Sequence, residues 1–211
     1  PVLFGPVECV TIMSHELRVP LGVGLIGLGH HGSRYAKHLL HDLPEARLVA
    51  VCRRRAIEGP GLVSAPTLRC YSDYHELIAD PHVEAVVVVT PPAINREICL
   101  AVAQAKKALL VEKPLAISAA DARAIAQAAQ GSGQTMMTAQ TLRFDAAVGL
   151  VQERHTQIGV LQYLSLASRM EPHGMSEDGR GFGGRGCLLE IGIHLLDLAR
   201  VLTGEEIRTV S

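Results

Sequence analysis

A glycine-rich turn between an apolar run and a helical segment constrains this chain more than any other feature of its sequence. Residues 21–27 (LGVGLIG) form an apolar run typical of a buried strand, and residues 33–43 have the pattern of a helix. Between them, Gly27, Gly29 and Gly32 follow the spacing GxGxxG. A strand, a tight turn and a helix in this order expose backbone N–H groups at the start of the helix.

Apolar runs and helical segments alternate along the chain to about residue 140. The strand-like runs are residues 46–52, 83–90, 108–114 and, as a last strand, 135–144. The helical segments are residues 72–80, which Ser72 is expected to cap, 94–107 and 118–133, which Gly131 and Gly133 end. The sequence therefore predicts an α/β fold with a doubly wound parallel Rossmann sheet over residues 21–140.

The pattern loosens after residue 140. We expect a connecting helix at residues 146–158, a strand at 159–169, a glycine-rich loop, and a helix from residue 187 that ends at Gly204. These elements predict the beginning of an incomplete α+β second domain over residues 141–211. Residues 1–20 are an N-terminal extension to which we assign no role.

Charge and cysteine content exclude several classes of protein. The formal net charge is −1, which provides no field to attract nucleic acid or an anionic membrane. The five cysteines are scattered without CxxC spacing, so we predict neither a disulfide framework nor a metal site. We see no secretion signal and no apolar run of the ~20 residues that a membrane span requires, and we expect a cytoplasmic protein.

The GxGxxG turn is the first candidate site. The three glycines suit a tight turn, close approach of a pyrophosphate to the backbone, and close packing of helix on strand. We therefore predict that Gly27, Gly29, His30, His31 and Gly32 bind the pyrophosphate of a nicotinamide dinucleotide. The alternative is a glycine-rich loop without a ligand.

The end of the second apolar run bears on the choice of cofactor. An acidic residue about 20 residues past the last glycine favours NAD, whereas arginine accommodates the 2′-phosphate of NADP. Here the sequence is Cys52-Arg53-Arg54-Arg55. We predict that Arg53 and Arg54 bind that phosphate and that NADP is preferred to NAD. The alternative is a solvated basic loop.

Two further groups of polar residues are candidates for catalysis. Lys113, in Glu112-Lys113-Pro114, follows a strand-like run and is expected at the carboxyl edge of the sheet, where open α/β sheets bind ligands. Glu190, His194 and Asp197 fall within an arc of about 60° on an otherwise apolar helix. For Lys113 the alternative is an ordinary surface lysine. For His194, a core histidine, a proton-transfer pair and a metal pair all fit the pattern.

Four motifs in the same order resemble the glucose–fructose oxidoreductase/inositol dehydrogenase/MocA oxidoreductases. They are GVGLIGLGHHG at the start, TPP at residues 90–92, EKP at 112–114 and EIGIHLLD at 190–197. The resemblance implies hydride transfer between NADP(H) or NAD(H) and a secondary alcohol of a sugar, cyclitol or similar polyol. It assigns substrate binding and proton transfer to Lys113 and His194. Thr90, Pro91 and Asn95, with Glu112 and Lys113, would lie beside the cofactor.

The chain departs from this family in three places. Glu190 replaces an aspartate and is expected to orient His194, Asn95 stands where histidine is frequent, and only one strand of the family's second sheet is predicted. We expect a truncated chain or fragment; the alternative is a small member that pairs this strand with another subunit in a homo-oligomer. A competing function is that of a non-catalytic NAD(P)-binding regulator or inactive remnant. The loop at residues 173–186, with Arg180 and Arg185, either borders the substrate or is a plain connection.

Overall fold

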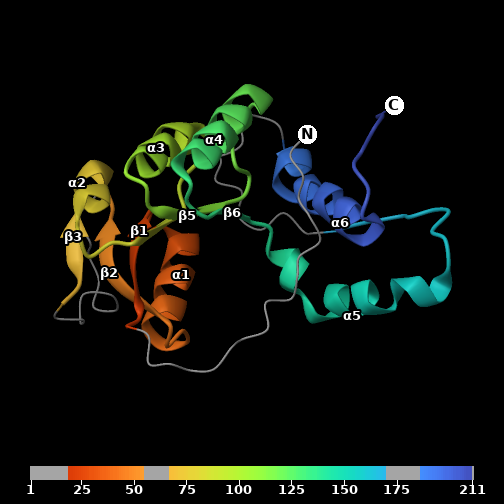
Figure 1. Ribbon diagram of the computed structural model, residues 1–211, viewed down its shortest axis with the longest axis horizontal. Helices are drawn as coiled ribbons and strands as arrows, with labels where there is room; N and C mark the ends of the chain where they lie inside the picture. The colour runs from red at the N-terminus through yellow and green to blue at the C-terminus, as the bar shows by residue number, and fades with distance from the viewer. Residues whose placement is uncertain (1–18, 55–66, 170–185, 211) are drawn as a thin grey trace.

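The computed structural model describes residues 19–54, 67–169 and 186–210. Its centre is a six-stranded parallel sheet in the order β3-β2-β1-β4-β5-β6 (Figure 1). The strands are β1 (Leu21–Ile26), β2 (Ala46–Cys52), β3 (Arg69–Tyr71), β4 (Ala85–Val88), β5 (Ala108–Glu112) and β6 (Met136–Ala139). This order reverses direction between β1 and β4, where doubly wound sheets bind dinucleotides. The predicted parallel α/β sheet is confirmed.

Helices connect the strands and continue beyond the sheet. They are α1 (His30–His41), α2 (Tyr74–Ala79), α3 (Pro92–Gln104), α4 (Ala119–Ser132), α5 (Ala146–Arg154) and α6 (Ile193–Thr203). The Ser118 hydroxyl caps α4 by accepting from the Asp121 N–H, and Gly204, in the left-handed conformation, ends α6. The predicted Ser72 cap of α2 is wrong, because Asp73 accepts from the His75 N–H instead.

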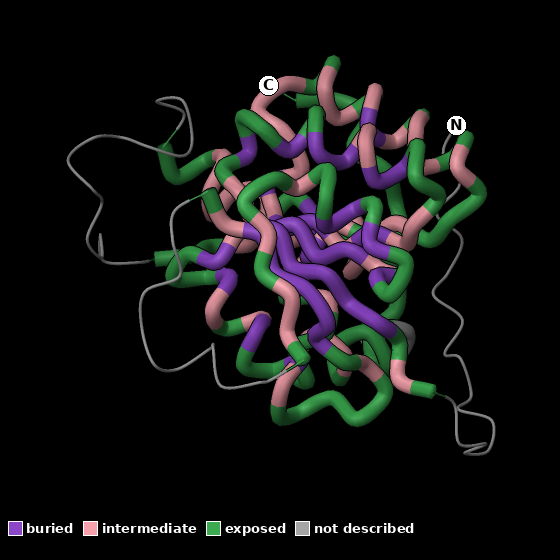
Figure 2. Tube along the Cα trace, turned by 90° about the vertical axis from the view of Figure 1, so that its left-hand side faces the viewer, coloured by how far each residue is buried: buried purple, intermediate pink, exposed green. Residues whose placement is uncertain are grey.

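Alternate residues of the strands feed two hydrophobic clusters, one on each face of the sheet. On β4, Val86 and Val88 face the cluster formed with α2, α3 and α4, whereas Val87 faces the cluster formed with α1. Figure 2 shows the buried residues concentrated along the central strands. This double cover explains why β1 and β4 are nearly continuous apolar runs, since both of their faces are buried.

The structure differs from the sequence-based expectation at several elements. The short strand β3 lies between the predicted strand at residues 46–52 and the predicted helix at 72–80, where no strand was expected. The last strand, predicted to run to residue 144, ends at Ala139, and a 3-10 helix (η1, Thr141–Phe144) follows. Residues 159–169, predicted as a strand, are in no strand, because no described segment pairs with them. Leu188–Gly192, predicted as α-helix, form a π-helix (η3) that continues into α6. Among the described residues, no helix has the length and apolarity to cross a membrane.

Candidate active site at the carboxyl edge of the sheet

Two of the three glycines in the turn after β1 occupy positions where a Cβ atom would clash with the backbone. A Cβ on Gly27, which has a φ of +96°, would lie 2.1 Å from the Val89 carbonyl oxygen, and one on Gly32 would lie 1.9 Å from the Gly27 carbonyl oxygen. At Gly29 a Cβ would meet nothing within 4 Å. Gly27 and Gly32 are therefore required for packing, whereas Gly29 leaves the backbone open to an approaching ligand.

The start of α1 offers the N–H groups that the sequence predicted. Gly29 is the N-cap and has no side chain to bond the free N–H groups, and the first turn of α1 has no acidic residue. His30 and His31 are exposed. Twelve residues of aligned peptide dipoles make this end attractive to an anion, so the residues present fit a pyrophosphate.

Glu112, at the end of β5, links the sheet edge to the start of α1. Its carboxylate is buried and its Oε1 accepts a hydrogen bond from the Tyr35 hydroxyl at 2.9 Å, while His31 Nε2 lies 2.8 Å from the same oxygen. Burial raises the pKa of Tyr35, and the neighbouring Glu112 charge raises it further. The structure therefore places Glu112, predicted among the cofactor residues, in bonds to protein groups that hold the glycine turn.

The residues predicted beside the nicotinamide ribose lie after the end of β4, the strand that pairs with β5. The Thr90 hydroxyl donates to Asn95 Oδ1 at 2.7 Å, and Asn95 Nδ2 donates to the carbonyl oxygens of Pro114 at 3.3 Å and Leu115 at 3.2 Å. Asn95 is 1% exposed. Its amide thus connects the turn after β4 to the loop after β5, and of this group Thr90 and Pro91 have the greater exposure.

Lys113 and His194 are brought near each other from segments that are far apart in the chain. Lys113 Nζ donates to the Glu190 backbone carbonyl at 3.0 Å, which links the end of β5 to the π-helix before α6. Burial lowers the pKa of the partly buried His194, and the nearby Lys113 charge lowers it further. Within the described chain, His194 Nδ1 is buried without a hydrogen-bond partner. A neutral imidazole beside an amino group can accept a proton from a ligand bound between them.

Glu190 was expected to orient His194, and the structure shows its backbone in a different contact. Its contribution is the backbone carbonyl that binds Lys113, and no described hydrogen bond joins its carboxylate to His194. The π-helix explains part of the difference, because its wider turn changes the α-helical spacing on which the prediction depended.

Asp197, the third polar residue of this helix, has a separate structural partner. Arg143, in η1, donates from Nε to Asp197 Oδ2 at 2.6 Å and from Nη2 to Oδ1 at 2.5 Å. Asp197 is buried, and its hydrogen bonds raise the pKa of Arg143. This bidentate pair anchors α6, and with it His194, to the segment that follows β6.

The end of β2 carries the two predicted phosphate-binding arginines. Arg53 is partly buried and Arg54 exposed, and no carboxylate of the described residues forms an ion pair with either. Burial raises the pKa of the adjacent Cys52 thiol to about 11, with the charges of Asp73 and Glu76 contributing. These two carboxylates belong to α2 and its cap.

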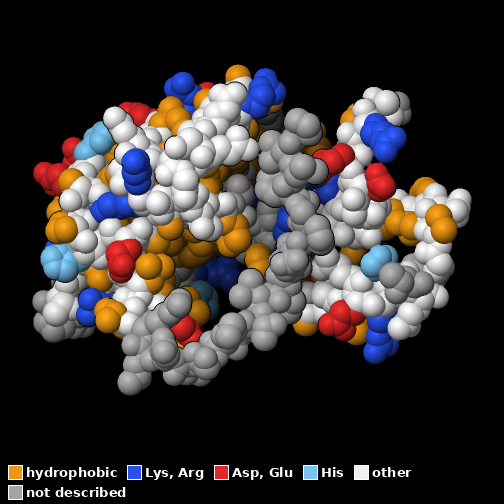
Figure 3. Space-filling view, in the orientation of Figure 1, with side chains coloured by type: hydrophobic (Ala, Val, Ile, Leu, Met, Phe, Trp, Pro, Cys, Tyr) orange, Lys and Arg blue, Asp and Glu red, His pale blue; other side chains and the backbone are white. Residues whose placement is uncertain are grey.

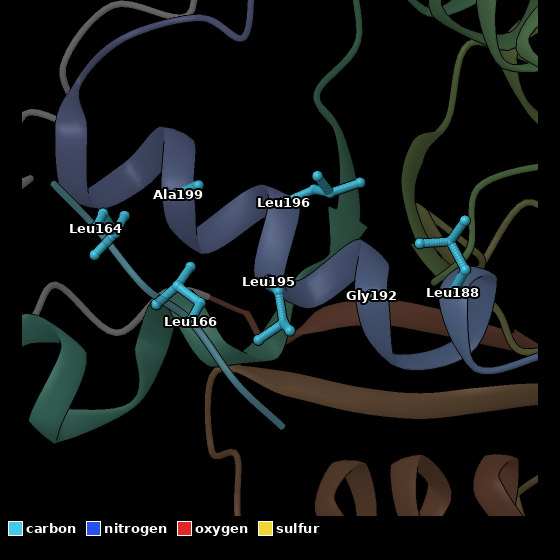
Figure 4. Close-up of a pocket in the computed structure, with 7 residues that line it drawn as sticks. All are labelled: Leu164, Leu166, Leu188, Gly192, Leu195, Leu196 and Ala199. Atoms are coloured by element: carbon cyan, nitrogen blue, oxygen red, sulfur yellow. The ribbon is translucent and has the colours of Figure 1, made fainter. Parts of the chain in front are cut away.

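An apolar groove of about 310 Å³ lies along α6, apart from these polar groups (Figure 4). It is lined by Leu164, Leu166, Leu188, Gly192, Leu195, Leu196 and Ala199. Since this lining has no polar side chain, the groove offers nothing for proton transfer.

On the face seen in Figure 3, basic and acidic side chains are interspersed. In the part of the chain that the structure describes, no group of three or more His, Cys, Asp or Glu side chains could hold a metal ion.

Three residues near the site were missed by the sequence analysis. Tyr35 binds Glu112, Arg143 binds Asp197, and Gln140 has a buried side-chain oxygen. The carboxylates of Glu112 and Asp197, which border or lie in apolar segments, could have indicated the first two, because buried acids need donors. Gln140 gave no signal beyond its place within the predicted last strand at residues 135–144. Arg180 and Arg185 lie outside the described residues.

This combination of fold and site defines a class: a Rossmann domain whose glycine turn and strand ends have the geometry that suits a dinucleotide, with a lysine and a histidine nearby. The family model described as "Oxidoreductase family, NAD-binding Rossmann fold" (GFO_IDH_MocA) matches residues 21–140. The chain belongs to this family, the glucose–fructose oxidoreductase/inositol dehydrogenase/MocA oxidoreductases.

The chain is similar to members of this family in sequence and in structure. The chain is 30% identical to myo-inositol 2-dehydrogenase of Thermotoga maritima over 89% of its own length and 56% of that protein. It is 29% identical to scyllo-inositol 2-dehydrogenase (NAD(+)) of Bacillus subtilis over 94% of its own length and 57% of that protein. The crystal structure of a probable dehydrogenase from Thermotoga maritima matches with a TM-score of 0.73 at 28% identity, covering 89% of this chain and 56% of that one. The chain thus spans little more than half the length of these relatives.

Proposed function

We propose that this protein transfers a hydride between a nicotinamide dinucleotide and a secondary alcohol carbon of a polyol, a cyclitol or a sugar. The observation that carries the proposal is the hydrogen bond from Lys113, at the carboxyl edge of the sheet, to the Glu190 carbonyl, four residues before His194. The Lys113 charge is close enough to lower the pKa of His194. The inositol dehydrogenase names of two relatives support a cyclitol as the first substrate to test.

The cofactor would be held by residues from three strand ends. Gly27, Gly29, His30, His31 and Gly32 would bind its pyrophosphate, Thr90 and Pro91 would border the nicotinamide ribose, and Arg53 and Arg54 would bind a 2′-phosphate. When bound, the nicotinamide supplies the hydride acceptor or donor, and the protein supplies position and electrostatics. Glu112 serves the cofactor indirectly, since its bonds to Tyr35 and His31 hold the turn.

Lys113 and His194 have different roles toward the substrate hydroxyl: Lys113 holds its oxygen and His194 accepts its proton. The Lys113 amino group, fixed by the Glu190 carbonyl, donates a hydrogen bond to the hydroxyl oxygen and holds it in place. His194 accepts the hydroxyl proton, which its lowered pKa permits because the imidazole is neutral near pH 7. Glu190 acts through its backbone, and Asp197 with Arg143 positions the helix.

Replacement of His194 tests this mechanism. His194→Ala should lower kcat about 100-fold or more while the Kd for the cofactor stays within threefold, because the residue moves a proton and is assigned no contact with the cofactor. For the native protein, kcat/KM for polyol oxidation should rise with pH and level off at a midpoint below 6.5, the ordinary pKa of histidine. Turnover of His194→Ala at the native rate would remove this residue from the mechanism.

Cofactor preference is tested at the end of β2. The double variant Arg53→Ala/Arg54→Ala should weaken NADPH binding about tenfold or more and leave NADH binding within twofold, since only NADPH carries the 2′-phosphate. Fluorescence titration with both cofactors measures this, with the exposed Arg123→Ala on α4 as the control for charge. The name of the Bacillus subtilis relative includes NAD(+). Tighter binding of NADH than of NADPH by the native protein would therefore contradict the predicted preference.

A second candidate, a non-catalytic NAD(P)-binding regulator, is favoured by one observation. Within the described residues no carboxylate is hydrogen-bonded to His194, so the imidazole lacks the partner that commonly orients a catalytic histidine. Screening myo-inositol, scyllo-inositol and other polyols for reduction of either cofactor separates the two functions. Tight cofactor binding with no reduction by any polyol would favour the regulator.

A further inference from the structure

Two buried polar atoms of the described residues have no hydrogen-bond partner, Gln140 Oε1 and His194 Nδ1. Buried polar atoms without hydrogen-bond partners are rare in folded proteins, so each one needs a physical explanation. The proposed function accounts for the imidazole. It leaves the Gln140 carboxamide without a role.

The backbone places Gln140 next to Lys113. On the paired strands β5 and β6, Glu112 is opposite Ala139, so Lys113 and Gln140 are the following residues at the same edge of the sheet. The Gln140 backbone is fixed on both sides, because its N–H donates to the Thr138 carbonyl at 2.8 Å and its carbonyl accepts from the Arg143 N–H at 3.0 Å.

The same short segment is tied to the helix that carries His194. Arg143, three residues after Gln140, forms the bidentate pair with Asp197, and His194 lies one turn before Asp197 on α6. Lys113 completes the connection through the Glu190 carbonyl. Lys113 and Gln140, which follow β5 and β6, and His194 of α6 are thereby gathered around one end of the sheet.

We propose that Gln140 is a specificity-determining residue whose carboxamide oxygen accepts a hydrogen bond from a second hydroxyl of the substrate, on a carbon next to the reacting one. The proposal rests on the proposed function. A vicinal diol fits this arrangement, because one hydroxyl engages Lys113 and His194 while its neighbour donates to Gln140. A site that bonds a substrate hydroxyl discriminates against an analogue that lacks it, since the protein group is then left unpaired.

The test compares Gln140→Leu with the native protein on two substrates: a polyol that the native protein oxidises, and its monodeoxy analogue without the hydroxyl beside the reacting carbon. Leucine keeps the approximate size of the side chain and removes both polar atoms. For the polyol, KM should rise at least tenfold with kcat within threefold. For the deoxy analogue, KM should be equal in the two proteins. Gln127→Leu, at an exposed position of α4, is the matched control and should change neither constant.

Two further measurements separate substrate recognition from a structural role. The melting temperature of Gln140→Leu should equal or exceed that of the native protein, because an unpartnered buried polar atom is removed, and the Kd for NADPH should be unchanged. If the leucine variant does not fold, Gln140→Asn, which withdraws the amide by one methylene, should show the same selective rise in KM.

Several outcomes would overturn the proposal. Equal losses on the polyol and its deoxy analogue, an unchanged KM for the polyol, or a weakened cofactor affinity would each remove Gln140 from substrate recognition. These outcomes leave the proposed function intact, because the native protein still turns over. A native protein that binds cofactor but neither oxidises nor binds any polyol in calorimetry would refute the proposed function and this inference together.

Discussion

Lys113 and His194 lie in two regions of the molecule that are held together differently. Lys113 follows β5, a central strand whose Leu109 and Val111 are buried between helices and neighbouring strands. His194 belongs to the region after residue 140, where the buried residues among those described are Asp197 and Leu198. The first region depends on apolar burial, and the second depends on a few polar contacts, of which the bond from Lys113 to the Glu190 carbonyl joins it to the first.

The two regions that carry Lys113 and His194 therefore differ in the interactions that stabilise them and in the free energy that each interaction contributes. Each fully buried aliphatic side chain of the sheet contributes about 1.5–3 kcal/mol, and many act together. The position of α6 depends on the Arg143–Asp197 pair and the Lys113–Glu190 hydrogen bond, with contributions of about 1.5–3 kcal/mol each as bonds to charged groups. A substitution in the sheet region should therefore change global stability, whereas one at these polar contacts should change the placement of His194.

The largest effect is expected in the glycine turn. Gly32→Ala should lower the free energy of unfolding by about 3 kcal/mol or more and abolish measurable NADPH binding, because the new Cβ would lie 1.9 Å from the Gly27 carbonyl oxygen. Thermal unfolding and fluorescence titration measure the two effects. Gly131→Ala, in α4 with nothing within 4 Å of its Cβ, should be neutral or stabilise by about 0.5 kcal/mol. Equal melting temperatures for the two variants would show that the turn is not sterically constrained.

A smaller and more local effect is expected at Arg143. Arg143→Met leaves the buried Asp197 carboxylate without its donors, so amide exchange in α6 should accelerate about 30-fold, equivalent to about 2 kcal/mol, while exchange in β1 and β4 stays unchanged. In the active protein, kcat should fall about tenfold or more as His194 loses its position.

A double variant identifies the cause of that loss. Arg143→Met/Asp197→Leu removes both partners and should restore the slow exchange of α6, because an apolar pair of similar volume avoids the uncompensated charge. Uniform acceleration of exchange over the sheet in Arg143→Met would contradict the division into two regions.

The same division describes what the sequence could predict. Strands β1, β2, β4 and β5 were recognisable because burial on both faces makes them apolar runs, and the glycine turn because its steric needs are local. The strand β3 was missed, since a three-residue edge strand, Arg69–Tyr71, has no period to detect. The segment 159–169 alternates like a strand but has no described partner, and alternation alone cannot supply one.

The candidate site was predictable as a set of residues but not as a set of contacts. Lys113 and Glu190 are 77 residues apart in the chain, and their bond uses a backbone carbonyl, which carries no sequence signal. The helical spacing of Glu190 and His194 suggested a side-chain pair, yet a π-helix intervenes. Arg143 and Asp197 are 54 residues apart, so only the tertiary fold shows that they meet.

The smallest effect is expected at an ion pair inside the well-packed region. Arg96 Nε lies 3.2 Å from Asp121 Oδ1 between α3 and α4, with the two side chains 53% and 35% exposed. Arg96→Ala should cost about 0.5 kcal/mol or less, because exposed pairs are screened by water and salt and because Ile98, Val102 and Ile125 already bury these helices against the sheet. Urea unfolding in low salt and in about 0.5 M NaCl, roughly three times physiological ionic strength, should show the small difference disappearing. A loss as large as that of Arg143→Met would mean that polar contacts, not apolar burial, also hold the sheet region together.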